Sequence, residues 1–291
     1  MTSKTNNNSI LQIFSVARNT FREAVRDRVL YNLLIFVLLI VVAAVILGDL
    51  TDGQEARTIV NMGLSSMLFF GTFIAIFVGV GLVSKEIEKR TVYSIFSKPI
   101  SRSTFIIGKY FGLCLTLLVN IVGMGIGVTI ALLYVNGGSL IYASWNAIFL
   151  IYFELAILTA VAIVFSSFST PALSALLTFF VFIIGHLSVA LRDLGENLGG
   201  TFTKYFFEAI YYILPNLSHF SFITDASHGF NPNFSYLATA IGYAIVYIAV
   251  LLIIFVVAYI TLSKPTETSN PTIPPVTNPL AAELILPFTK M

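Results

Sequence analysis

Charged residues are scarce in this chain. Only 10% of its 291 residues are Asp, Glu, Lys or Arg, whereas soluble domains carry about 25%. So few charges cannot cover a water-facing surface, and the composition therefore excludes an ordinary soluble domain. The net charge of +2 says little by itself about acidic ligands, and we expect no nucleic-acid partner.

Residues that carry out chemistry are also few. The single cysteine, Cys114, lies in an apolar run and allows neither an intrachain disulfide nor a cysteine-based metal site. His219, Asp225 and His228 share one connecting segment but are too scattered to fix a tetrahedral geometry, so we expect no metal site. The apolar runs hold one acid and one histidine, too little for a membrane-embedded enzyme.

Apolar residues make up 57% of the chain and are concentrated in long runs. A membrane-spanning helix needs about 20 mostly apolar residues, and a lipid-exposed backbone must satisfy its own hydrogen bonds. We therefore predict an all-α integral membrane protein with a transmembrane domain at 29–262. Its six predicted spans are 29–47, 64–83, 110–135, 145–168, 171–191 and 236–262.

The basic residues are distributed unevenly between the two sides of these spans. With the N-terminus inside, the cytoplasmic side holds thirteen of the sixteen: Lys4, Arg18, Arg22, Arg26, Arg28, Lys85, Lys89, Arg90, Lys98, Arg102, Lys109, Lys264 and Lys290. The other side holds Arg57, Arg192 and Lys204. Lysine and arginine favour the cytoplasmic side. This pattern predicts a multi-pass protein of a bacterial or archaeal cytoplasmic membrane with both termini inside.

Two segments outside the spans are amphipathic. Residues 1–9 are polar, and we expect a flexible N-terminus that leads into a cytoplasmic interfacial helix at 10–28, with Ser9 as its N-cap and Arg18, Arg22 and Arg26 as a basic stripe toward membrane lipids. The external loop 192–235 contains a second such helix around Phe206, at the outer interface or re-entrant, which Pro215 ends. The proline-rich cytoplasmic tail at 263–291 is typical of an extended or disordered segment.

The connection between the second and third spans carries the strongest functional signal. It alternates charge, becomes amphipathic, and is interrupted at Pro99; the charged positions are Lys85, Glu86, Glu88, Lys89 and Arg90. A helix at 84–98 is consistent with docking into a protein cleft. It is also consistent with an interfacial helix whose lysines reach anionic lipid, and the residues alone favour this second interpretation.

This segment resembles the coupling region of the ABC-type-2 permease family. The resemblance rests on an acidic and basic cluster, a threonine, a Pro-Ile-Ser-Arg run and a Gly-Lys pair, here Glu86, Glu88, Lys89, Arg90, Thr91, Pro99, Ile100, Ser101, Arg102, Gly108 and Lys109. Arg90 stands where many relatives have glycine. The stretch TVYSIFSKPISR is most similar to the branch for multi-copper enzyme maturation, which includes the nitrous oxide reductase maturation permease. FSSFSTPALSALLTFFVFIIGH and YYILPNLSHF add to the resemblance.

The resemblance implies a type V ABC exporter-like arrangement. Its parts would be a dimer with a second permease copy or a paralogue, two separate ABC ATP-binding subunits that bind ATP and Mg, and a coupling helix that transmits their motion. The chain contains no Walker A loop of its own, because the nearest spacing, Gly48 to Gly53, is followed by Gln54 and Glu55. An alternative is a non-transporting assembly or mechanotransmission subunit that acts on a periplasmic or membrane partner.

Two further sets of residues lie inside the spans. Glu154 and His186 are sixteen residues either side of Thr170, hence at similar depth, and could form a polar pair. Such a pair has a structural role, a role in the translocation path or a role in proton relay. Gly108 with Gly112 and Gly123 with Gly127 allow close helix approach, either within one subunit or at a dimer interface.

Overall fold

The computed structural model describes residues 2–26, 53–88, 102–197 and 201–262, with isolated positions at 35, 38, 41, 42 and 46. Every regular element in these ranges is a helix. The predicted first span at 29–47 lies almost wholly outside the described residues, and the predicted tail at 263–291 lies outside them entirely.

Five of the described helices are long and apolar enough to cross a membrane. They are α3 (Glu55–Glu88), α5 (Arg102–Tyr134), α6 (Ile141–Ser166), α7 (Pro171–Asn197) and α10 (Phe234–Leu262). Each one contains or closely matches one of the last five predicted spans. The chain is therefore an all-helical, multi-pass membrane protein.

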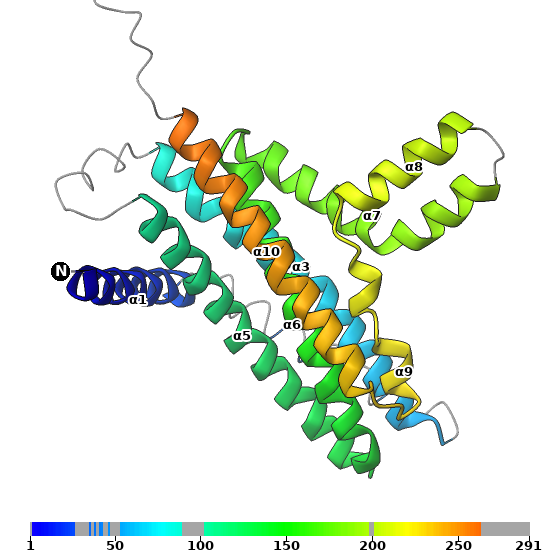
Figure 1. Cartoon of the computed structure of the whole chain (residues 1–291). Coiled ribbons are helices and arrows are strands. Elements are labelled where there is room, and N and C mark those ends of the chain that lie inside the picture. Colours follow the sequence, from blue (N-terminus) through cyan, green and yellow to red (C-terminus); the bar gives the residue numbers. More distant parts are fainter. Residues whose placement is uncertain are drawn as a thin grey trace, which may run out of the picture.

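Helix α6 lies at the centre of the bundle, against α3, α5, α7 and α10 (Figure 1). It is the most enclosed of the five spans, whereas α7 and α10 are the least. Helices α3 and α6 run in the same direction, since Gly71 of α3 contacts Leu155 and Gly79 contacts Ala162. The missing side chains at these glycines let the two backbones approach closely.

A tight turn joins α6 to α7. Helix α6 ends at Ser166, and Pro171 is the first residue of α7. The backbone N–H at this position has no partner within a helix, so proline, which lacks it, loses no hydrogen bond there. The hydroxyl oxygens of Ser169 and Ser174 lie 2.6 Å apart and link the turn to the first turn of α7. The two spans thus form the predicted hairpin.

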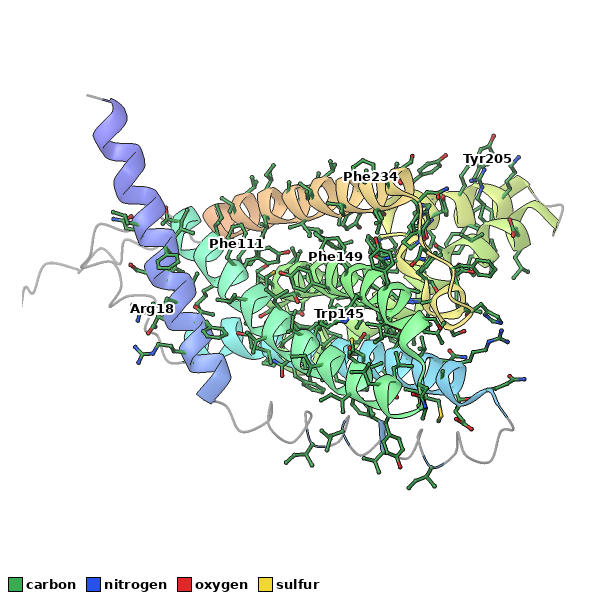
Figure 2. All side chains as sticks on the ribbon, turned by 90° about the horizontal axis from the view of Figure 1, so that it is seen from below. Arg18, Phe111, Trp145, Phe149, Tyr205 and Phe234 are labelled. Carbon is green, nitrogen blue, oxygen red and sulfur yellow. The ribbon has the colours of Figure 1, made fainter. Side chains whose placement is uncertain are left out.

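Helix α1 (Thr2–Arg26) lies across one end of the bundle, transverse to the spans (Figure 2). The predicted start at Ile10 is wrong, because the helix continues back to Thr2 and Ser9 is inside it rather than at its N-cap. The physical reason is that residues 2–9 contain no proline or glycine to end the helix, and each residue added to an established helix closes a further hydrogen bond.

The connection from α7 to α10 runs beside the bundle and reaches the end opposite α1 (Figure 1). It contains α8 (Thr201–Ile213), the short turn η2 (Leu217–Phe220) and α9 (Ile223–Ser227), while a further short turn, η1 (Gly138–Leu140), precedes α6. Helix α8 returns along the last turns of α7, where Gly195 contacts Phe207. This α7–α8 hairpin projects sideways from the bundle (Figure 1), and α8 ends two residues before Pro215, as the sequence predicts.

Candidate functional site

The predicted coupling segment at 84–98 is described only at its first residues. Lys85, Glu86 and Glu88 belong to the last turns of α3, so this part of the segment continues the second span instead of starting a separate helix. Lys89, Arg90, Thr91 and Pro99 lie outside the described residues, and Arg102 is the first residue of α5. The two flanking helix ends lie at the α1 end of the bundle (Figure 1).

Gly108 and Gly112 of α5 form the crossing point with α1. A Cβ atom at Gly108 would lie 2.8 Å from Cβ of Val16, and one at Gly112 would lie 2.6 Å from the carbonyl oxygen of Ala17. Thr20, which also contacts Gly112, is buried by this crossing. The close approach at this pair of glycines is therefore a contact within one chain.

The second pair of glycines on α5 has a different environment. A Cβ atom at Gly127 would meet nothing within 4 Å, and Gly123 is half-buried. Val122 and Ile126, on the same side of α5, are exposed. This part of α5 remains open in the single chain, so an interface with a second copy stays a prediction.

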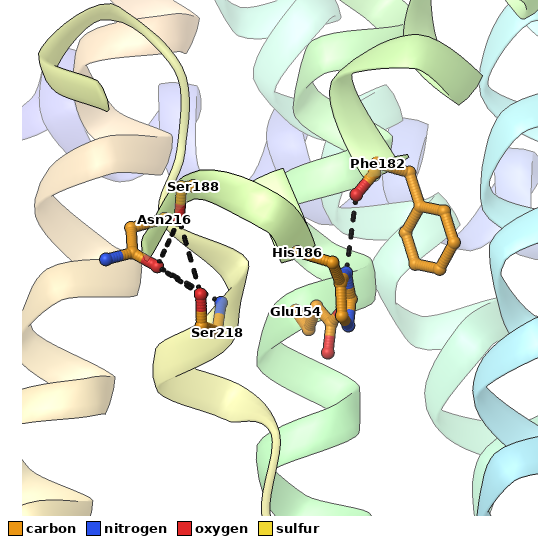
Figure 3. A network of polar contacts seen from close by, with 6 residues as sticks. All are labelled: Glu154, Phe182, His186, Ser188, Asn216 and Ser218. Atoms are coloured by element: carbon orange, nitrogen blue, oxygen red, sulfur yellow. Dashed lines mark hydrogen bonds and ion pairs between the residues drawn. The ribbon is translucent and has the colours of Figure 1, made fainter. Parts of the chain in front are cut away.

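The structure brings Glu154 of α6 and His186 of α7 together. Nε2 of His186 lies 3.4 Å from Oε1 of Glu154, and its Nδ1 lies 3.3 Å from the carbonyl oxygen of Phe182 (Figure 3). The Glu154 side chain is 0% exposed, and neither carboxyl oxygen has a hydrogen-bond partner among the described residues. The contact has the separation of an ion pair without the geometry of a directed hydrogen bond.

Thr72 of α3 is a third buried polar residue in this region. It is 1% exposed, and its hydroxyl has no hydrogen-bond partner in the described part of the chain. Other buried threonines of the spans, Thr116, Thr159 and Thr178, bond the carbonyl four residues earlier. Sequence reasoning missed Thr72, because a threonine in an apolar run usually makes that local bond.

Asn216 joins the connection between α7 and α10 to three helices. Its side-chain oxygen accepts hydrogen bonds from the hydroxyls of Ser188 and Ser218, both at 2.8 Å, and from the Ser218 backbone N–H (Figure 3). Its backbone N–H donates to Tyr243 of α10, and its side-chain nitrogen donates to Tyr211 of α8. In the sequence, the only signal for this segment was the resemblance of YYILPNLSHF to the ABC-type-2 permease family.

These two polar sites meet on one short stretch of α7. Gly185 packs against Pro215 and Leu217 of the connection between α7 and α10, His186 contacts Glu154, and Ser188 bonds Asn216. A displacement of α7 at this point would therefore disturb the buried acid and the segment around Asn216 together. Such an arrangement suits conformational transmission better than bond-making chemistry.

These features define a polytopic α-helical membrane protein with a buried polar contact at its centre. The family model for "ABC-2 family transporter protein" matches residues 14–264, which is most of the chain. The chain therefore belongs to the ABC-2 family of transporter proteins, whose members are membrane components of transport systems. A search of curated proteins gives no match.

Proposed function

We propose that this chain is the permease subunit of an ABC transporter, most consistent with an exporter. It forms the translocation path as a dimer with a second copy or a paralogue, and two separate ATP-binding subunits bind and hydrolyse ATP with Mg. Membership of the ABC-2 family supports the class of protein, and the charged segment 84–102 supports the mode of coupling. The likeness to copper enzyme maturation permeases remains a sequence prediction.

The observation that carries this proposal is the packing of the two helices that flank the charged segment. Helix α3 packs on central α6 through Gly71 and Gly79, and α5 packs on α1 through Gly108 and Gly112. Closely packed helices move as units instead of deforming continuously. A force applied between residues 88 and 102 would therefore reach the centre of the bundle through α3 and the end of the bundle through α1.

Charge reversal in the coupling segment tests this proposal. A Lys89→Glu/Arg90→Glu variant should lose most of the ATP-binding subunit on co-purification and most of the ATP turnover of the complex. The reason is that acidic side chains would then replace the basic ones expected to face the docking cleft. Lys204→Glu, on the exposed surface of α8, is the matched control and should retain both. Unchanged attachment and turnover in the double variant would contradict the proposal.

The alternative function, mechanical action on a periplasmic or membrane partner, is favoured by one feature of the structure. Phe202, Tyr205 and Tyr212 of α8 are exposed on the projecting α7–α8 hairpin, and Tyr205 points away from the bundle (Figure 2). A complex whose ATP turnover responds to a protein bound at this hairpin, and to no transported compound, would support this second function.

A further inference from the structure

A row of aromatic side chains leads to the buried acid. The Phe182 ring centroid lies 4.7 Å from that of His186, Phe179 lies 6.4 Å from Phe182, and Phe73 of α3 lies 6.2 Å from Phe179. All three phenylalanines are half-buried. The faces of such rings attract cations electrostatically, most strongly where water is excluded.

Thr72 lies on the side of α3 that faces this region. Gly71, one residue before it, contacts α6, and Phe73, one residue after it, contacts α7. Successive residues of a helix are about 100° apart around its axis, so the buried Thr72 lies about 100° from each of these two contacts. Because Gly71 contacts Leu155, the neighbour of Glu154, Thr72 lies at a similar depth to the contact between Glu154 and His186.

His186 is the accessible member of this group. Its side chain is 26% exposed, whereas that of Glu154 is 0% exposed, and its neighbours Ile183 and Leu187 are exposed on the open apolar face of α7. The imidazole lies beside the Phe182 ring and within contact distance of the Glu154 carboxyl. Rotation of His186 toward the open face would leave the carboxyl beside an aromatic row without its nearest polar partner.

We propose that Thr72, Glu154, His186 and the row Phe73–Phe179–Phe182 form a binding site for lipophilic cations, entered from the apolar face of α7. This inference rests on the proposed transport function and assigns it a substrate class. A buried carboxylate needs a compensating charge or donor once His186 has moved. A cation with apolar substituents supplies that charge and also packs on the rings, whereas an anion is repelled and a neutral compound leaves the acid unpaired.

The probe is tetraphenylphosphonium, with tetraphenylborate as an anion of the same shape. Equilibrium binding is measured on the full chain with its ATP-binding subunits in lipid nanodiscs. The wild-type protein should bind tetraphenylphosphonium saturably, and tetraphenylborate should not compete. Glu154→Gln should weaken binding at least about tenfold, whereas Asp193→Asn, which removes an exposed acid of α7, should leave it unchanged.

A second variant distinguishes this site from a purely structural pair. His186→Ala removes the internal competitor for Glu154, so it should retain or strengthen tetraphenylphosphonium binding. Equal binding of the two probe ions by the wild-type protein, or equal affinity in Glu154→Gln and wild type, would overturn the proposal. Absence of saturable binding in a complex that still hydrolyses ATP would reject the substrate class alone, whereas failure of any ATP-binding subunit to associate would reject the proposed function itself.

Discussion

Glycines on one helix have opposite environments in this protein. On α5, Gly112 is in contact with the backbone of α1, while Gly127 faces open space. Both follow the same four-residue spacing from another glycine, so the sequence predicted close packing at both pairs and left the partner open. The structure assigns a partner only to the pair nearer the start of α5.

This difference gives a matched pair of substitutions. Gly112→Ala should destabilise the protein by about 1–3 kcal/mol, because the added methyl group would overlap the Ala17 carbonyl oxygen and Thr20. Gly127→Ala should be neutral or stabilising by up to about 1 kcal/mol, because alanine favours the helix and meets nothing. Thermal unfolding in detergent measures both. Equal losses would show that α1 does not pack on α5 as described.

The buried acid was predictable in part. Equal spacing of Glu154 and His186 from Thr170 predicted their similar depth, and the 3.4 Å contact agrees with a pair. Their functional role stays a prediction. Thr72 could not be found in this way, because nothing in an apolar run specifies which helix face turns toward α6 and α7.

Tyrosines of α10 bind the connection between α7 and α10 at three points. The hydroxyl of Tyr236 donates to the His219 carbonyl at 2.7 Å and that of Tyr247 donates to the Ile213 carbonyl at 3.1 Å, while Tyr243 accepts from the Asn216 N–H at 2.8 Å. Residues 213–219 are thereby bonded to a membrane-spanning helix along three turns. At the scale of elements, α10 and this segment form one unit.

Removal of these hydroxyls should loosen that unit. Each of the substitutions Tyr236→Phe, Tyr243→Phe and Tyr247→Phe deletes one bond worth about 1 kcal/mol, which corresponds to about fivefold faster local opening. Hydrogen–deuterium exchange of residues 213–220 should rise accordingly. Tyr134→Phe, at an exposed position of α5, is the control and should leave the exchange unchanged. Unaltered exchange in all three variants would contradict the bonding described.

The whole molecule has two distinct ends. Helix α1 and the ends of α3 and α5 that flank the charged segment lie at one end, and α9 and the start of α10 lie at the other (Figure 1). The distribution of basic residues predicts that the α1 end is cytoplasmic. Labelling of single-cysteine variants from the two sides of the membrane tests this orientation.

The single cysteine makes that test simple. In a Cys114→Ala background, a membrane-impermeant maleimide should label an Asn231→Cys variant in intact cells, because this exposed residue precedes α10 at the α9 end. An Arg18→Cys variant, at an exposed position of α1, should react only after the membrane is broken. Labelling of Arg18→Cys in intact cells, with Asn231→Cys protected, would reverse the predicted orientation.

The sequence alone determined that the chain is a helical membrane protein and where the five described spans lie. The length of each apolar run determines whether it can cross the membrane. A backbone without access to water must form its hydrogen bonds within the helix. Only the tertiary structure decided which faces meet: α1 with Gly108 and Gly112 of α5, and Gly71 of α3 with Leu155, the neighbour of Glu154. The apolar residues of α6 favour no single face, so its sequence carries no periodic signal for its rotation, and packing against its neighbours sets that angle.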